Sequence, residues 1–480
     1  MIEFRPLPSA AHDDVEPSAA GDPATIVAIS TPPGRGGIGV VRLSGPRAAT
    51  LARSLFRPAA AIAAPTASGQ AVFGRFVDAA ADTIDHGYLV VFHPPATFTG
   101  EETAELWAHG SPAALRLLLS TAVAAGARPA TPGEFTLRAF LNGRIDVTQA
   151  EAIRDLIEAR TAFQAKVAHD QVRGRISEAV NRLKDRLVEL VARLEASIEF
   201  SEESEAGRFL PDEGAWPEAR SLREGIETLA GTYERGRRVR EGATVALAGP
   251  PNAGKSSLFN RLLEEDRAIV TPVEGTTRDV LEETLDLGGV PVTLLDTAGL
   301  HAPRDEADAE AVRRARGALE SADHVLLVLD WSRPLSEEEN GLLDAVADGR
   351  CLVILNKIDL ACGLGLDTVL RLKQRRGALE VSAKTGQGIE PLRRALGQAV
   401  ALEGVVGREE TFVTNVRHRD LLVRAAAALA RAEEGARRGV SDECLLLDCR
   451  EALDRLGEIT GEVGIDGIYE RIFLTFCIGK

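Results

Sequence analysis

The chain has 480 residues, 45% of them hydrophobic, and a formal net charge of −16 at pH 7. This length allows for about three domains of the usual size. The acidic balance argues against a protein that wraps nucleic acid by charge alone, because neutralising phosphates requires clustered Lys and Arg. Five cysteines without a C-x-x-C pair argue against both a disulfide framework and a zinc site.

The N-terminal segment, residues 1–22, predicts a short disordered tail on a cytoplasmic protein. It is acidic, and it lacks the apolar core of a signal peptide and the Arg-rich character of an organelle transit peptide. No stretch of the chain reaches the ~18–20 consecutive apolar residues of a membrane span. We therefore expect no membrane association.

Residues 23–142 predict a small α+β domain. Short apolar runs alternate with Gly/Pro turns, which is typical of strands joined by tight loops. The runs are Ile26–Ile29, Ile38–Leu43, Val72–Val77 and Tyr88–Phe92. The loop Thr31-Pro32-Pro33-Gly34-Arg35-Gly36-Gly37 is either a simple turn, which the residues alone favour, or a segment that approaches a ligand.

Helical patterns occupy residues 143–240 and return at 403–480. In the first part, apolar residues recur at intervals of 4, 3, 4, 3 and 4, namely Ile176, Val180, Leu183, Leu187, Leu190 and Leu194. A bundle core is the favoured interpretation, and a coiled-coil dimer is the alternative. The second part carries the stripes Leu421, Leu422, Ala425, Leu429 and Ala452, Leu453, Leu456, Ile459. We predict one helical domain interrupted by a nucleotide-binding domain at 241–402, because insertion is tolerated where chain ends lie close together.

A phosphate-binding loop opens the inserted region. Residues Gly249–Ser256 read G-P-P-N-A-G-K-S, after an apolar strand at Thr244–Ala248 and before a helix at Ser256–Leu263. In this context the backbone N–H groups and the helix N-terminus hold phosphates. Lys255 supplies a point charge, and Ser256 is a ligand for Mg²⁺.

Three further motifs follow in the order that a GTP-binding domain requires: Asp296-Thr297-Ala298-Gly299, Asn356-Lys357-Ile358-Asp359 and Ser382-Ala383-Lys384. Each closes a predicted strand, so the motifs should meet at the carboxyl edge of a parallel sheet. Asp296 can hold Mg²⁺ through water, and Gly299 can contact the γ-phosphate. Asp359 is placed to accept both N–H donors of guanine, which adenine lacks. The sequence therefore predicts GTP rather than ATP.

A switch segment is expected between the phosphate loop and Asp296, with Thr277 as the second Mg²⁺ ligand. Ras-like GTPases carry a water-orienting Gln after Asp-Thr-Ala-Gly, but Leu300 stands there in this chain. Because an apolar side chain cannot polarise water, hydrolysis requires a cation, a residue from elsewhere or a partner. The residues expected to bind GTP are Asn252, Ala253, Gly254, Lys255, Ser256, Ser257, Thr271, Pro272, Val273, Glu274, Gly275, Thr276, Thr277, Asp296, Thr297, Ala298, Gly299, Asn356, Lys357, Asp359, Ser382, Ala383 and Lys384.

From residue 24 to residue 480 the chain resembles the MnmE (TrmE) family of tRNA-modifying GTPases. Besides the nucleotide motifs, the resemblance includes the Thr31–Gly37 loop, Phe98-Thr-Gly-Glu, Arg138-Ala-Phe-Leu-Asn-Gly and the terminal Cys477-Ile-Gly-Lys480. It implies a multidomain α/β fold. The parts are an N-terminal α+β folate-binding-like domain that dimerises, a discontinuous all-α helical domain and an inserted Ras-like GTPase domain with a mostly parallel sheet.

The resemblance also implies partners and a reaction. A homodimer is expected to join the flavoprotein MnmG, which carries FAD, in a heterotetramer. Together they would add a carboxymethylaminomethyl or aminomethyl group to C5 of the wobble uridine of certain tRNAs.

Two further ligands are implied by the resemblance. The first is a potassium ion that stabilises the transition state of hydrolysis, with ligands at Asn252, Thr271, Val273 and Thr276. The second is 5-formyl- or 5,10-methylene-tetrahydrofolate, at Arg42, Glu105 and Arg144 with Lys480 close by. Arg144 departs from the pattern, since some members carry Lys there, and the hydrogen-bond geometry of the two cations differs.

The expected catalytic residues are Asp308, Asn252, Lys255 and Cys477. Asp308 stands where the family has a water-orienting Glu, and Glu310 is the alternative two residues on. Cys477 is either a core residue beside an apolar run or a contact for substrate chemistry.

Two other classes of GTP-binding protein compete with this interpretation. An Era-type ribosome-assembly switch would carry an RNA-binding module and a basic net charge. A mechanical GTP-binding protein would carry a basic amphipathic helix or long unbroken heptads. Neither pattern is visible in the sequence.

Overall fold

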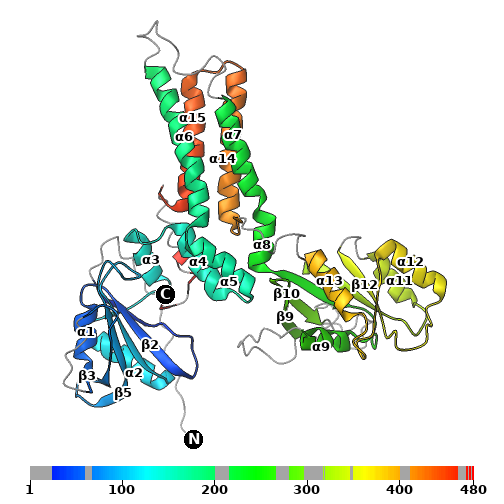
Figure 1. Cartoon of the computed structure of the whole chain (residues 1–480), viewed down its shortest axis with the longest axis horizontal. Helices are drawn as coiled ribbons and strands as arrows, with labels where there is room; N and C mark the ends of the chain where they lie inside the picture. Colours follow the sequence, from blue (N-terminus) through cyan, green and yellow to red (C-terminus); the bar gives the residue numbers. More distant parts are fainter. Residues whose placement is uncertain are drawn as a thin grey trace. The chain divides into compact units, whose positions relative to one another are not determined.

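The computed structural model describes residues 24–59, 67–199, 216–265, 281–296, 317, 319–345, 350–400, 411–462, 472–473, 475–476 and 478–479. The chain forms two compact units, and the boundary between them falls within one helix. The first unit comprises Met1–Ala150 and Gly464–Lys480, and the second comprises Glu151–Val463. Figure 1 shows the elements of both units.

The first unit contains a seven-stranded sheet in the order β3-β4-β5-β6-β2-β1-β7. Its neighbours pair antiparallel, except for the parallel pair β1 and β7. In β4 the side chains of Val72 and Phe76 are buried while Phe73 is exposed, as expected of a sheet with one covered face. The strands are β1 (Ile26–Ile29), β2 (Gly36–Ser44), β3 (Phe56–Pro58), β4 (Ala71–Val77), β5 (Thr83–Phe92), β6 (Thr103–Gly110) and β7 (Arg128–Pro129).

The helices α1 (Ala48–Ser54) and α2 (Pro112–Ala124) cover one face of this sheet. Leu51 of α1 and Leu118 of α2 pack with Leu43, Leu89 and Leu106 in one core. Helix α3 (Glu134–Leu141) contributes Phe135 to a smaller core with Ile26 and Ala28 of β1. The residues of the sheet that point away from α1 and α2 therefore form a separate face.

The second unit contains a six-stranded sheet in the order β13-β12-β11-β8-β10-β9. All neighbours are parallel except the edge strand β9, which pairs antiparallel with β10. The strands are β8 (Ala243–Ala248), β9 (Leu281–Leu287), β10 (Val290–Asp296), β11 (His324–Asp330), β12 (Cys351–Asn356) and β13 (Leu379–Val381).

Helices cover both faces of this sheet, as in doubly wound α/β folds. α9 (Lys255–Glu265) and α13 (Ile389–Val400) share one core with the sheet. α11 (Glu337–Ala345) and α12 (Leu366–Arg376) share a core on the opposite face. The strands alternate between the two cores, with Val328 in the first and Leu327 and Leu329 in the second.

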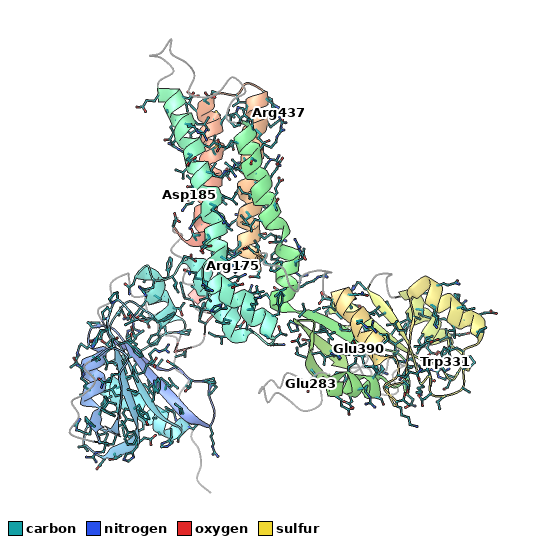
Figure 2. All side chains as sticks on the ribbon, in the orientation of Figure 1. Arg175, Asp185, Glu283, Trp331, Glu390 and Arg437 are labelled. Carbon is teal, nitrogen blue, oxygen red and sulfur yellow. The ribbon has the colours of Figure 1, made fainter. Side chains whose placement is uncertain are left out.

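Four long helices of the second unit form a bundle (Figure 1). They are α6 (Arg175–Glu199), α7 (Trp216–Gly231), α14 (Val416–Arg437) and α15 (Asp442–Thr460). Leu187, Leu190 and Leu194 of α6 pack with the apolar stripes of the other three helices in one core, so the bundle interpretation of the heptad-like spacing is confirmed. Charged side chains such as Asp185 and Arg437 stand on its outer surface (Figure 2).

Among the described residues, the second unit also has the shorter helices α4 (Val147–Glu158), in which the unit boundary falls, α5 (Ala162–Val172) and α8 (Tyr233–Glu241). The multidomain α/β class predicted from the sequence is confirmed. Within the described ranges, no helix combines the length and the apolar character needed to cross a bilayer.

Candidate functional site

The nucleotide motifs meet at one edge of the six-stranded sheet. The strands β8, β10 and β12 run parallel with β11 between β8 and β12, and they end at Ala248, Asp296 and Asn356. The short strand β13 ends at Val381, directly before Ser382. The carboxyl ends of parallel strands share one edge of the sheet. Motifs that lie far apart in the sequence therefore meet there in one site.

The phosphate loop links β8 to α9 through residues that need unusual backbone conformations. Gly254 has φ +93°, and a Cβ at this position would lie 2.3 Å from Nδ2 of Asn356. Only glycine therefore fits. Asn252 also has positive φ, at 64°, which asparagine adopts more readily than most residues. Within the described part of the chain, its carboxamide forms no hydrogen bond.

Lys255 begins α9 and its side chain is buried beneath the loop. Its Nζ donates hydrogen bonds of 3.1 Å to the carbonyl oxygens of Gly249 and Pro250. Burial lowers the pKa of Lys255 below the usual lysine value, and the charge of Asp296 opposes this shift. A buried ammonium group whose described hydrogen-bond partners are neutral carbonyl oxygens would form a stronger, charge-assisted bond with an anionic phosphate oxygen.

Ser256 and Asp296 supply the oxygen atoms expected of a magnesium site. The Oγ of Ser256 donates a hydrogen bond of 2.8 Å to Oδ2 of Asp296. A hydroxyl and a carboxylate oxygen this close together fit the hard-oxygen preference of Mg²⁺, which also retains water ligands. These two residues therefore fit the role predicted for them.

Asn356 joins the phosphate loop to the loop at Ser382-Ala383-Lys384, called the base loop. Its side chain is 2% exposed. Its Nδ2 donates to the carbonyl of Ala253 at 2.9 Å, and its Oδ1 accepts the N–H of Ala383 at 3.1 Å. The side chain thus satisfies backbone groups from two motifs at once.

Asp359 is oriented by Ser382 of the base loop. The Oγ of Ser382 donates a hydrogen bond of 2.6 Å to Oδ1 of Asp359. This hydrogen bond lowers the pKa of the Asp359 carboxyl below its usual value, although burial opposes the shift. The carboxylate is therefore ionised and can accept N–H donors from guanine.

Asp330 is a site residue that the sequence motifs did not reveal. It ends β11, and its Oδ2 accepts a hydrogen bond of 2.6 Å from Nζ of Lys357. Burial raises the pKa of Asp330, but hydrogen bonds from Lys357 and Ser332 outweigh it and hold the pKa below its usual value. The sequence did offer one indication: Asp330 ends an apolar strand, as the predicted motifs do, and that strand, β11, lies between β8 and β12.

Several predicted site residues lie outside the described residues. They are Thr271, Pro272, Val273, Glu274, Gly275, Thr276, Thr277, Thr297, Ala298, Gly299, Leu300, Asp308, Glu310, Cys477 and Lys480. Of the predicted potassium ligands, only Asn252 is described.

Two of the four predicted folate residues, Arg42 and Glu105, lie on the sheet face opposite α1 and α2. Arg42 and Glu105 are cross-strand neighbours on β2 and β6, with Nε of Arg42 2.9 Å from Oε1 of Glu105. The indole Nε1 of Trp107 donates to the other oxygen of Glu105 at 2.8 Å. The guanidinium of Arg42 stands 6.0 Å from the ring centroid of Phe135, a cation–π contact. A carboxylate held in this way fits the N–H edge of a pterin ring.

Trp107 was missed by the sequence reasoning. It could have been predicted from the alternation of side chains along a strand, because residues 105 and 107 point to the same face of the sheet. Arg144 lies elsewhere in the unit, beside Gly100: a Cβ added to Gly100 would be 3.3 Å from Cγ of Arg144. The described contacts do not join Arg144 to Glu105.

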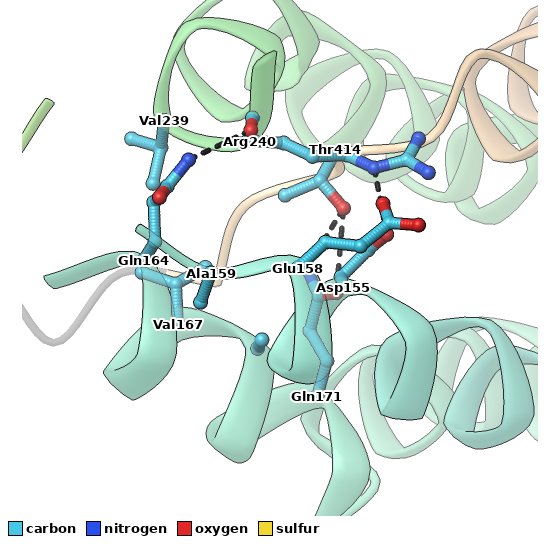
Figure 3. A pocket seen from close by; sticks show the side chains of 10 residues that line it. Asp155, Glu158, Ala159, Gln164, Val167, Gln171, Val239, Arg240 and Thr414 are labelled. Atoms are coloured by element: carbon cyan, nitrogen blue, oxygen red, sulfur yellow. Dashed lines mark hydrogen bonds and ion pairs between the residues drawn. The ribbon is translucent and has the colours of Figure 1, made fainter. Parts of the chain in front are cut away.

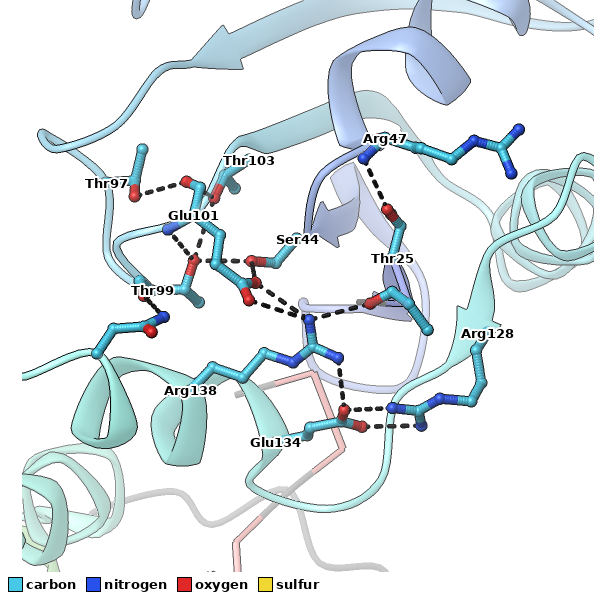
Figure 4. Close-up of polar contacts among 12 residues, drawn as sticks. Thr25, Ser44, Arg47, Thr97, Thr99, Glu101, Thr103, Arg128, Glu134 and Arg138 are labelled. Atoms are coloured by element: carbon cyan, nitrogen blue, oxygen red, sulfur yellow. Dashed lines mark hydrogen bonds and ion pairs between the residues drawn. The ribbon is translucent and has the colours of Figure 1, made fainter. Parts of the chain in front are cut away.

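Two sequence motifs of the first unit form one buried polar network (Figure 4). Arg138 donates from Nη1 to Glu101 at 3.1 Å and from Nη2 to Glu134 at 3.0 Å. Asn142, in the same motif as Arg138, donates to the carbonyl of Thr99 at 2.7 Å. Burial raises the pKa of Glu134, but bonds from Arg128 and Thr131 and the charge of Arg138 outweigh it and lower the pKa. The network fixes α3 against the sheet.

The C-terminal segment packs on the first unit. Phe473 and Phe476 pack with Ala150 and Phe140. The Oγ of Ser30 donates to the carbonyl of Gly479 at 3.1 Å. Gly479 has φ +98°, and a Cβ there would lie 2.3 Å from the carbonyl oxygen of Ile29. Gly479 therefore lies against the end of β1 and Ser30, which follows it.

A small cavity of about 40 Å³, large enough for ordered water, lies among α4, α5 and α8 (Figure 3). Its polar lining includes Asp155, Gln164, Gln171, Arg240 and Thr414. The carboxyl of Asp155 is 2.9 Å from Nε of Arg240. Burial raises the pKa of Asp155 even though Arg240 opposes the shift. None of the nucleotide motifs lines this cavity.

The sheet topology, the phosphate loop and the loop that orients Asp359 define the class of the second unit: a phosphate-loop GTPase domain joined to a helical bundle. A family model described as the MnmE helical domain matches residues 147–477, and one described as the GTP-binding protein TrmE N-terminus matches residues 25–144. The chain belongs to the MnmE family of tRNA modification GTPases, as the sequence motifs predicted.

Relatives support this assignment along the whole chain. The tRNA modification GTPase MnmE of Koribacter versatilis is 44% identical over 459 residues, which cover 95% of this chain and 99% of that protein. That of Aquifex aeolicus is 41% identical over 456 residues, with the same coverage. That of Natranaerobius thermophilus is 39% identical over 461 residues, again with 95% and 99% coverage. The alternative of an Era-type switch does not account for matches outside the nucleotide domain.

Proposed function

We propose that this chain is a potassium-activated GTPase that acts with the flavoprotein MnmG on C5 of the wobble uridine of certain tRNAs. The addition would be a carboxymethylaminomethyl or aminomethyl group. The observation that carries the proposal is the joining of phosphate loop and base loop by Asn356, in a chain related to MnmE proteins over 95% of its length. A cytoplasmic location follows from tRNA as substrate.

Binding of GTP with Mg²⁺ is supported by the described contacts. Ser256 and Asp296 would hold the metal, which supplies positive charge to the phosphates. Lys255 lies ready beneath the loop to turn toward a phosphate. Asp359, ionised and oriented by Ser382, would select guanine.

Activation by potassium is supported by Asn252 and Leu300. The carboxamide of Asn252 stands exposed at the tip of the phosphate loop, where its oxygen can coordinate a cation. Leu300 cannot orient water, so hydrolysis needs another contribution, and a bound cation would supply positive charge to the transition state. Thr271, Val273 and Thr276 would complete the ion's ligands.

Binding of 5-formyl- or 5,10-methylene-tetrahydrofolate is supported by the pair Arg42 and Glu105. Glu105, held by Arg42 and Trp107, would accept N–H donors of the pterin. The docked segment that ends beyond Gly479 would bring Lys480 and Cys477 to the same unit. Association as a homodimer, and with MnmG in a heterotetramer, belongs to the same proposal.

Two measurements test this function. The rate of GTP hydrolysis should be much higher in potassium than in sodium, and Asn252→Ala should abolish that difference while Asn260→Ala, an exposed residue of α9, should keep it. Nucleoside mass analysis of tRNA from a deletion strain should show loss of the modified wobble uridine. Equal rates in both salts, together with unaffected wobble uridine, would contradict the proposal.

A further inference from the structure

Arg261 of α9 binds the base loop through two adjacent carbonyl groups. Its Nε donates to the carbonyl of Ala383 and its Nη2 to the carbonyl of Lys384, both at 3.0 Å. Its Nη1 lies 3.4 Å from the carboxylate of Glu264 on the same helix. A planar guanidinium can hold two neighbouring acceptors at once, which a lysine ammonium on a flexible stem cannot do with the same geometry.

The contact with Lys384 sets the direction of a second group. In a planar trans peptide, the carbonyl and the N–H of the next residue point in opposite directions. By holding the carbonyl of Lys384, Arg261 therefore also orients the N–H of Thr385. That N–H donates to Oγ of Ser382 at 3.2 Å, and the same Oγ donates to Oδ1 of Asp359 at 2.6 Å. A continuous series of contacts thus leads from Arg261 to the carboxylate of Asp359, the group proposed to bind guanine.

We propose that Arg261 is a positioning residue for guanine specificity. It does not contact the base, but it fixes the loop that fixes Asp359. The inference rests on the proposed GTP function and adds a determinant outside the four motifs. Helix α9 would then serve both halves of the site, with Lys255 at the phosphates and Arg261 at the base loop.

Equilibrium titration with GTP and ITP separates this role from a general structural one. ITP lacks the 2-amino group of guanine, so the ratio of GTP to ITP affinity reports the contact with Asp359. Arg261→Ala should reduce that ratio about fivefold to tenfold, as expected for one weakened hydrogen bond to a charged group. Arg261→Lys should have an intermediate effect. Arg394→Ala should leave the ratio unchanged, because the side chain of this α13 residue is 70% exposed and pairs with Glu390 of the same helix at 3.7 Å.

A double-variant cycle tests the series of contacts itself. Ser382→Ala breaks the series between Arg261 and Asp359, so it should reduce the ratio by itself, and Arg261→Ala/Ser382→Ala should reduce it no further. Additive losses, or equal losses of GTP and ITP affinity in Arg261→Ala, would overturn the inference. If Arg261→Ala does not fold, Arg261→Lys with Ser382→Ala gives the same cycle. A wild-type chain that binds ATP as tightly as GTP would instead count against the proposed function.

Discussion

The carboxylate of Glu151 and the imidazole of His418 form a buried contact in the second unit, with Oε2 of Glu151 2.7 Å from Nε2 of His418. Arg417 also binds this carboxylate, at 3.0 Å, and donates to the carbonyls of Glu458 and Ile459 at the end of α15. The cluster therefore joins α4 to α14 and α15. Burial raises the pKa of Glu151, but the charges and hydrogen bonds of His418 and Arg417 outweigh it and lower the pKa to about 2.

Removal of this carboxylate should destabilise the bundle. We expect Glu151→Gln to lower the free energy of unfolding at pH 7 by about 3–5 kcal/mol, because it leaves the mostly buried guanidinium of Arg417 without a counter-ion. The pKa of Glu151 is depressed in the folded state, so its contribution is fully present above pH 4.5 and is lost as the pH falls toward 2. Urea denaturation of wild type and variant at pH 7 and at steps down to pH 3 should show the difference shrinking. The exposed Glu189→Gln on α6 is the control and should change little.

Asn356→Ala should weaken nucleotide binding without preventing folding of the bundle. The substitution leaves the carbonyl of Ala253 and the N–H of Ala383 without their partner, and each loss costs about 1–3 kcal/mol. We therefore expect GTP affinity to fall about tenfold to a hundredfold. Asn340→Ala removes an exposed amide of α11 whose described hydrogen bond goes to the carbonyl of Ser336, just before the helix, and it should bind GTP as wild type does. Wild-type affinity in Asn356→Ala would show that the two loops do not depend on this bridge.

We propose Asp308 as the water-orienting residue, with Glu310 as the alternative; both lie outside the described residues. We expect Asp308→Ala to reduce turnover of GTP about a hundredfold, as is typical for loss of a positioned carboxylate, while Glu310→Ala retains most of it. Asp308→Glu restores the longer side chain of the family and should remain active. Single-turnover hydrolysis in potassium measures the chemical step. Unchanged turnover in Asp308→Ala with loss in Glu310→Ala would reverse the assignment.

The sequence predicted the parts of the site that are contiguous along the chain. The strand, loop and helix around Lys255 follow from local apolar pattern and glycine spacing, and the structure has β8 and α9 where they were expected. The shared edge of the motifs followed from the direction of parallel strands. These features depend on neighbours within a few residues or on general rules of chain topology.

The contacts that join distant segments could not be predicted in the same way. Arg261 and Ala383 are 122 residues apart, and Glu151 and His418 are 267 residues apart. The motifs containing Glu101 and Arg138 were each visible, but their pairing was not. Such pairs depend on how helices pack, and one sequence contains no pattern that identifies which of its 49 arginines meets which carboxylate or carbonyl.

The docked C-terminal segment provides a prediction specific to the first unit. At Gly479 any side chain would place Cβ 2.3 Å from the carbonyl oxygen of Ile29, in a backbone conformation with φ +98°. Gly479→Ala should therefore release the segment from Ser30, at a strain of about 1–3 kcal/mol if it stays docked. We expect faster removal of C-terminal residues by carboxypeptidase and binding of 5-formyl-tetrahydrofolate weakened about tenfold. GTP hydrolysis, which depends on the other unit, should be unchanged.

Ile478→Ala is the control, because that side chain is 62% exposed. Carboxypeptidase sensitivity equal to wild type would show that docking does not depend on the glycine, whereas released ends with normal folate affinity would remove the C-terminus from the proposed folate site.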